Sequence, residues 1–383
     1  MLREAALIAW YTGDGAAARV YVDRALDVAL RTSDMDLDIR ARRLEIFIAY
    51  GEQREPQAAI ARMRENAAQA RAHGLVVHEG WALLYLSFIT GNLSDVEAAR
   101  QLSQQAGAWS WMFALREGTL QLMEGRREAS EAIFNQIRHE LRLGIPTMAA
   151  WVDAKEACLY LHRGDLDEAR NLLDGPGATA DACSCGLFAA ERSATQGWLA
   201  WEEGRLPEAC AHLARAGADK VMETYNTISA GPAYLALRVD ALLRLGRFDE
   251  AAAAISGFEA FNLGYERFMA AALAAAQFRL DPTLQQAEAA ETATTPWPWL
   301  HALAGCWRGE FLQDAGAAEG ARRQFGAIGA HLGVRRAEAV LRRLGARLPR
   351  RERGAGTLSP REIEVADLVA EGLSNPAIAG AST

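Results

Sequence analysis

Three stretches of this 383-residue sequence share one pattern: LYLHRGDLDEARNLL (159–173), LAWEEGRLPEACAHL (199–213) and LLRLGRFDEAAAAI (242–255). Each runs from the end of an apolar segment to a glycine, then one residue, a Leu or Phe, one further residue and Glu-Ala before the next apolar segment. The shared glycines are Gly164, Gly204 and Gly246, spaced 40 and 42 residues apart. An internal repeat of this length indicates a repeat architecture rather than one compact core.

The pattern predicts a pair of helices joined by a tight turn. Glycine adopts the left-handed conformation at a helix end without a Cβ penalty. Aspartate, glutamate and proline then occupy the first turn of the second helix, where negative charge meets the positive end of the helix dipole and a missing N–H is not needed. The alanine after the glutamate is small enough to let the two helices approach closely. Because one hairpin leaves an apolar face uncovered, we expect the hairpins to stack into a tetratricopeptide-like superhelix.

Looser copies of the pattern precede these three, at Gly13, Gly51, Gly91 and Gly125. The period is therefore about 34 to 42 residues, as in helical-hairpin repeats.

Beyond Asp281 the pattern blurs, although helical periodicity continues. We expect one or two degenerate repeats there, interrupted at TTPWPW (294–299), and then a final helix that ends at Gly345.

The sequence thus predicts an all-α chain of about eight hairpins. The repeat array is expected over residues 1–346, a basic Arg/Pro/Gly linker over 347–356 and a separate helix-turn-helix module over 357–383.

Charge is distributed unevenly along the chain. Residues 1–334 carry a net charge of −11, residues 335–353 carry +6 from eight Arg and two Glu, and the last thirty residues carry −3. Because a nucleic-acid surface needs clustered positive charge, the Arg-rich stretch is the expected phosphate contact. A solvated helix face followed by a linker is the alternative. The candidate residues beside the module are Arg350, Arg351 and Arg353.

The five cysteines are odd in number and lack the paired spacing of a secreted disulfide framework. The first ten residues place Arg3 and Glu4 inside what would have to be the apolar core of a signal peptide. No run approaches the roughly 18 apolar residues that span a bilayer. We therefore expect a cytoplasmic protein with no membrane association.

The tail segment LSPREIEVADLVAEGLSN (358–375) contains several devices that start and end helices. Ser359 can cap the first turn, a proline follows at the first helical position, and Glu362 completes a capping box. Gly372 ends this predicted helix, and Ser374 then caps a second one.

The string from 358 to 379 resembles the start of the LuxR-type helix-turn-helix module. The matching positions are Leu358, Arg361, Glu362, Glu364, Val365, Leu368, Ala370, Gly372, Asn375, Ile378 and Ala379. The preceding segment, 322–350, is similar to the end of the repeat region in large LuxR-type regulators of the MalT-like class. The resemblance implies a repeat region that senses an effector or binds a protein, and a module that binds DNA through residues such as Ser374 and Asn375.

Two departures from that class limit what the resemblance implies. No G-x-x-x-x-G-K-[ST] motif occurs, so the P-loop ATPase that precedes the repeats in the class is not assigned here. The printed sequence gives Gly380-Ala381-Ser382-Thr383 where the recognition helix of the family would follow. Because base readout needs that helix, we do not expect sequence-specific DNA binding by this chain, and we expect its tail to fray or to dock on the last repeat.

Other candidate sites have simpler explanations. Cys158 and His162 lie four residues apart on a predicted helix, and Cys183 and Cys185 form a C-x-C pair, but neither reaches a four-ligand zinc pattern. Buried thiols are the favoured interpretation. Because H-E-x-x-H and G-x-S-x-G motifs are also absent from the sequence, we expect no metal, no cofactor and no enzymatic activity.

The ten tryptophans include three pairs at close spacing: Trp109 and Trp111, Trp198 and Trp201, Trp297 and Trp299. Core packing between stacked hairpins is the favoured interpretation, and a concave surface that binds an effector or peptide is the alternative.

The sequence therefore predicts a LuxR-type transcriptional regulator whose repeat array senses a small effector or binds a protein. The alternative is a helical-repeat scaffold that binds a protein partner and does not contact DNA.

Overall fold

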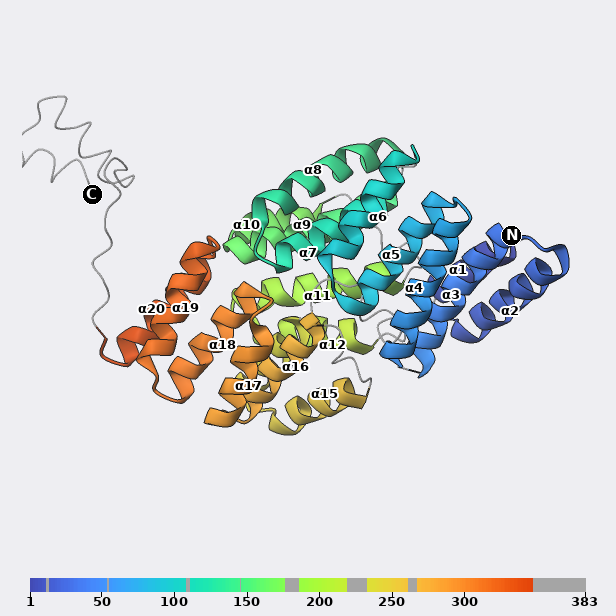
Figure 1. Cartoon of the computed structure of the whole chain (residues 1–383). Helices are drawn as coiled ribbons and strands as arrows, with labels where there is room; N and C mark the ends of the chain where they lie inside the picture. Colours follow the sequence, from blue (N-terminus) through green and yellow to red (C-terminus); the bar gives the residue numbers. More distant parts are fainter. Residues whose placement is uncertain are drawn as a thin grey trace, which may run out of the picture. The chain divides into compact units, whose positions relative to one another are not determined.

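The structure, a computed structural model, describes residues 1–11, 14–53, 55–107, 111–144, 146–175, 186–218, 233–260 and 267–346. Within these ranges the regular structure is entirely helical (Figure 1), which confirms the predicted all-α fold class. The chain divides into two compact units, Met1–Leu344 and Gly345–Thr383. Because nearly all of the second unit lies outside the described ranges, the fold given below is that of the first.

The described helices are α1 (Leu2–Tyr11), α2 (Gly15–Thr32), α3 (Met35–Gln53), α4 (Pro56–Ala72), α5 (Val76–Thr90), α6 (Leu93–Gln105), α7 (Trp111–Met123), α8 (Arg127–Gly144), α9 (Pro146–Arg163), α10 (Leu166–Asp174), α11 (Gly186–Glu202), α12 (Leu206–Ala218), α14 (Ala233–Arg244), α15 (Phe248–Ala260), α16 (Arg267–Leu280), α17 (Leu284–Thr294), α18 (Pro298–Phe311), α19 (Ala315–Ala327) and α20 (His331–Arg343).

In the described ranges these helices form nine consecutive hairpins, from α1–α2 to α18–α19, and α20 packs on α19. The sequence estimate of about eight was close. The repeat pattern also predicted the turns correctly, because the glycine after the first helix has a positive φ in five hairpins, from +68° to +91°. These turn glycines are Gly91, Gly125, Gly164, Gly204 and Gly246.

The alanine of the Glu-Ala pair lies in the interior of the array in each of the three clearest repeats. Ala169, Ala209 and Ala251 are fully buried. A larger side chain at these positions would force the helices apart, so the small residue is needed for close packing.

Two sequence predictions about turns were wrong. Gly51 does not end its helix, because α3 continues to Gln53 and the next helix begins at Pro56. TTPWPW is not an interruption of the repeats but the turn between α17 and α18, in which Trp297 is the N-cap residue and Pro298 occupies the first helical position. The expected stop at Gly345 (φ +72°) is confirmed, and Gly13 lies outside the described residues.

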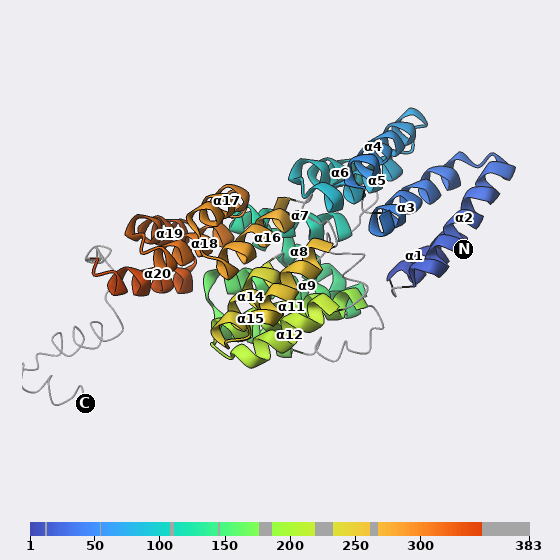
Figure 2. The same cartoon turned by 90° about the horizontal axis from the view of Figure 1, so that it is seen from below.

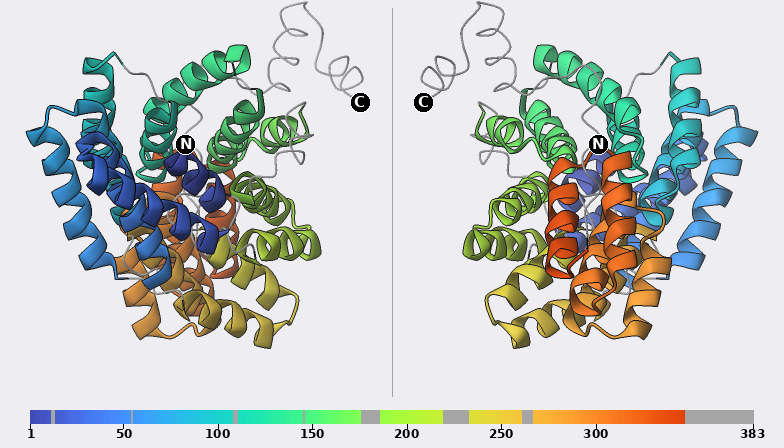
Figure 3. Two further views of the ribbon diagram at one scale, coloured as in Figure 1. Left: turned by 90° about the vertical axis from the view of Figure 1, so that its right-hand side faces the viewer. Right: turned by 90° about the vertical axis from the view of Figure 1, so that its left-hand side faces the viewer.

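The hairpins of this unit follow a superhelical path. In Figure 3 the chain passes around an axis from the blue N-terminal hairpins through green to yellow and then orange. Figure 2 shows the same order from below. Later hairpins therefore come to lie against the turns of earlier ones.

Direct contacts join helices α16 and α20 to the turns of earlier hairpins. The guanidinium of Arg267, at the start of α16, donates from Nε to the carbonyl oxygen of Gly91 (3.0 Å) and pairs with Glu124 at the end of α7. Leu332 of α20 packs against the turn at Gly164, where an added Cβ would lie 2.6 Å from its Cγ. We call this line of contacts the inter-turn seam.

Candidate functional site

All seven candidate residues of the predicted module and linker lie outside the described residues. They are Arg350, Arg351, Arg353, Ser359, Glu362, Ser374 and Asn375. Their predicted roles in capping and DNA contact therefore stay predictions.

The first part of the Arg-rich stretch is described, and one of its arginines is a seam residue. Arg336 of α20 pairs with Glu202 of α11 (2.8 Å), whose side chain is 3% exposed. Its guanidinium carbon lies 4.2 Å from the ring centroid of Trp201. The guanidinium of Arg336 pairs with a buried carboxylate and packs on an aromatic ring. It therefore has a structural role and is a poor candidate for binding a phosphate.

The other described arginines of the stretch lie nearer the surface. Arg343 pairs with Glu310 (2.9 Å) and Arg342 with Glu338 (3.4 Å), whereas Arg335 is exposed. The basic stretch is thus partly neutralised by its own neighbourhood.

An aromatic cluster forms the centre of the seam. The rings of Trp198 and Trp299 are 4.4 Å apart between centroids, and His162 lies 4.8 Å from Trp198 and 5.6 Å from Trp299. Trp198, Trp297 and Trp299 are all buried. For these tryptophans the core interpretation is confirmed, while Trp109 lies outside the described residues.

His162 and Cys158 are both buried in this core and contact each other. The Nδ1 atom of His162 lies 2.8 Å from the carbonyl oxygen of Cys158, and Nε2 has no partner among the described residues. Burial lowers the pKa of His162 to about 4, because a protonated ring would leave an unpaired charge in an apolar core. Burial also raises the pKa of the Cys158 thiol to about 11, so this cysteine is an inert core residue rather than a nucleophile.

Buried ionic contacts also tie neighbouring hairpins together. Lys155 of α9 pairs with Glu191 of α11, and both side chains are almost completely buried. Asp240 of α14 accepts hydrogen bonds from Trp201 Nε1 (2.7 Å) and Arg279 Nε (2.7 Å). The sequence did not predict the four charged residues of these contacts, because the repeat pattern is defined at the turns and says nothing about charges on the buried faces of the first helices.

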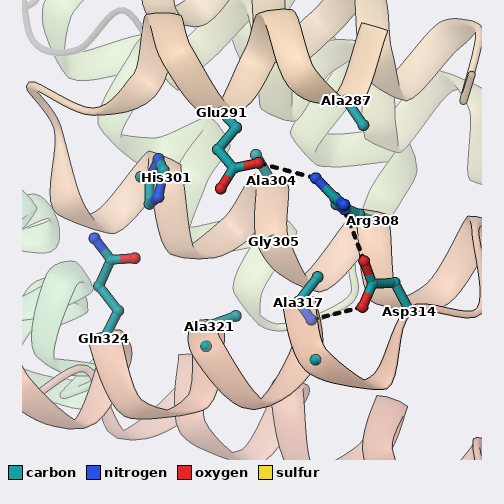
Figure 4. A pocket seen from close by; sticks show the side chains of 12 residues that line it. Ala287, Glu291, His301, Ala304, Gly305, Arg308, Asp314, Ala317, Ala321 and Gln324 are labelled. Atoms are coloured by element: carbon teal, nitrogen blue, oxygen red, sulfur yellow. Dashed lines mark hydrogen bonds and ion pairs between the residues drawn. The ribbon is translucent and has the colours of Figure 1, made fainter. Parts of the chain in front are cut away.

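Pockets between helices of the described unit include the following two. One, of about 360 Å³, lies between α3 and α4, where Arg42, Arg62 and Asn66 are among the lining residues. The other, of about 470 Å³, lies between α17, α18 and α19 (Figure 4). Its floor consists of small residues, which leave room between the helices: Ala304, Gly305, Ala317, Gly320 and Ala321.

An ion-pair network crosses one end of the pocket between α17, α18 and α19. Arg308 of α18 donates from Nε to Asp314 (2.9 Å) and from Nη1 to Glu291 of α17 (2.9 Å). Asp314 is also the N-cap of α19, where its Oδ1 accepts from the backbone N–H of Ala317 (2.9 Å). That backbone bond, together with Arg308, lowers the pKa of Asp314. No sequence pattern indicates this pocket, because its residues lie beyond Asp281, where the repeat pattern blurs.

A comparison with protein-family models and with curated proteins finds no match to this sequence. Among the described helices, none combines the length and the apolar character that crossing a membrane requires.

Proposed function

We propose that this chain belongs to a cytoplasmic transcriptional regulator of LuxR type, in which the repeat array binds a small effector or a protein and the C-terminal module binds DNA. The observation that carries the proposal is the 22-residue string 358–379 with its eleven matching positions. The superhelix supports it, because a helical-repeat region before the module is the architecture that the resemblance implies.

The proposal assigns the phosphate contacts to the linker. The described arginines Arg336 and Arg343 have acidic partners. Arg350, Arg351 and Arg353 are therefore the basic residues that we expect to meet the DNA backbone next to the module.

DNA binding by the full chain tests the proposal. We expect a fluorescently labelled duplex of random sequence to be bound at 20 mM salt, with affinity that falls linearly on a log–log scale up to 200 mM salt. Each phosphate contact contributes about 0.9 to that slope, so replacing Arg350, Arg351 and Arg353 with Ala should lower it by up to about 2.7.

The matched control replaces three exposed arginines of the first hairpins, Arg24, Arg31 and Arg64, with Ala. It changes the net charge equally and should leave the slope unchanged. Equal losses in both triple variants would mean that the effect is one of total charge, and no binding at 20 mM salt would contradict the proposal.

A scaffold that binds a protein without contacting DNA is the second candidate. Two observations favour it: residues 1–334 carry a net charge of −11, and Arg336 is committed to Glu202 and Trp201. Absence of DNA binding in the experiment above would leave this function.

A further inference from the structure

The pocket between α17, α18 and α19 is built to stay open. An added Cβ at Gly320 would meet no atom within 4 Å, so this position faces free space. At Gly305, by contrast, an added Cβ would lie 3.2 Å from the Cβ of Ala321. Helices α18 and α19 are therefore in close contact at Gly305 and Ala321, while the neighbouring position Gly320 faces open space.

The charges around the pocket leave one negative charge unbalanced. Arg308 is the cation of the network, and it is shared by Glu291 and Asp314. The Oδ1 and Oδ2 atoms of Asp314 are occupied by the α19 N-terminus and by Arg308. Glu291 uses Oε2 for Arg308, and its Oε1 has no partner among the described residues. Figure 4 shows this second oxygen on the side of the carboxylate nearer His301 and Gln324.

The hydrogen bonds of His301 fix which of its nitrogens is an acceptor. The hydroxyl of Thr294 donates to the carbonyl oxygen of Ala290 (2.6 Å), so its oxygen accepts from the Nδ1–H of His301 (3.0 Å). In the neutral imidazole the lone pair is then on Nε2, which has no partner among the described residues. The side-chain amide of Gln324 also has no hydrogen-bond partner among the described residues. It adds a second acceptor, its carbonyl oxygen, on the side of the pocket where His301 lies.

From these observations we propose that the pocket binds a small organic cation with a primary ammonium group. The ammonium donates hydrogen bonds to Glu291 Oε1, His301 Nε2 and the Gln324 carbonyl oxygen, and its short aliphatic chain lies on the floor formed by Gly305 and Gly320. An ammonium has three donors and no acceptor, which matches three acceptors with one net negative charge. An anion would have to displace a carboxylate from Arg308. This inference does not depend on the DNA-related function.

The test is a ligand-observed NMR titration of the full chain at pH 7.5 and 50 mM salt. The probe is n-butylammonium, with butanol and butyrate as the neutral and anionic analogues of the same length. We expect saturable binding of the amine and at least tenfold weaker binding of both analogues. Equal binding of the three, preferred binding of butyrate, or no binding of the amine would overturn the proposal.

Two variants locate the binding. Gly320→Leu fills the pocket with a good helix-forming residue and should abolish binding, whereas Gly326→Leu on the same helix, also with free space around it, should not. Glu291→Gln should weaken binding at least tenfold. The control Glu288→Gln changes the same charge on an exposed site of α17 and should have little effect.

Thermal unfolding of each variant establishes that it is folded before binding is measured. Undiminished binding by a folded Gly320→Leu or Glu291→Gln variant would place the amine elsewhere and contradict the proposal.

Discussion

At the scale of single residues, His162 makes the stability of the molecule depend on pH. Its pKa is about 4 in the folded chain against about 6.5 when unfolded, so the unfolded state binds more protons between these values. Stability from this residue is therefore complete above pH 6.5 and is lost as pH falls towards 4. We expect the free energy of unfolding in urea to be about 2 kcal/mol lower at pH 5.0 than at pH 7.5 on account of His162 alone.

The variant His162→Phe isolates that contribution. It keeps an aromatic ring beside Trp198 and Trp299 but cannot be protonated, so the difference between pH 7.5 and 5.0 should shrink by about 2 kcal/mol. The control His331→Gln removes an exposed histidine outside the aromatic cluster, so comparison with it separates the loss of any histidine from the loss of the buried one. An unchanged pH dependence in His162→Phe would show that protons reach His162 in the folded state.

Residue-level predictions from sequence succeeded where local chemistry decides the structure. Gly164 needs a positive φ and Ala169 must be small, and both requirements are visible within one repeat. The prediction of a turn at Gly51 was wrong, because a glycine alone does not end a helix. Helix α3 continues to Gln53, and α4 begins only at Pro56. Trp297 was correctly assigned to the core, but the identity of its neighbours depends on contacts 100 or more residues away, such as His162.

At the scale of elements, the ion pair between Arg336 and Glu202 ties α20 to α11. Replacing Arg336 with Ala leaves the buried carboxylate of Glu202 without its cation and uncovers the ring of Trp201. We expect a loss of about 2 to 3 kcal/mol in the free energy of unfolding, below the usual value for a fully buried pair because Arg336 is itself partly exposed. Amide hydrogen exchange over α20 should become faster, which mass spectrometry can measure.

Two further variants test this explanation for α20. Arg335→Ala changes the neighbouring exposed residue and should alter stability by less than about 0.5 kcal/mol. Adding Glu202→Gln to Arg336→Ala removes the unpaired charge, so the double variant should be more stable than Arg336→Ala alone. If the second substitution makes the protein less stable still, the carboxylate is not the source of the loss.

Neither the inter-turn seam nor the pocket could be predicted from the sequence. Helix order and turn positions follow from a local period, but the meeting of α16 with the Gly91 turn joins residues 176 positions apart. No sequence period encodes that contact. The pocket residues Glu291 and Arg308 come from different helices in the blurred repeats, so their ion pair was equally invisible in the sequence.

At the scale of the Met1–Leu344 unit, the inter-turn seam joins later hairpins to hairpins much earlier in the chain. A helical-repeat array normally has contacts between neighbouring repeats alone, and its curvature can then change easily. Here Arg267 holds one end of the seam, on Gly91 and Glu124, and Arg336 holds another, on Glu202. The array should therefore resist opening until these ties are removed.

Replacing both Arg267 and Arg336 with Ala should open the seam while the hairpins stay folded, because the contacts within each hairpin are untouched. We expect small-angle X-ray scattering of the full chain to show a larger radius of gyration than for the unmodified protein, with unchanged helical circular dichroism. The control is Arg170→Ala with Arg205→Ala, which removes the same charge from ion pairs confined to neighbouring hairpins. If both double variants keep the original radius of gyration, the apolar contacts around Trp299 hold the seam closed without the arginines, and the ion pairs are not what limits opening.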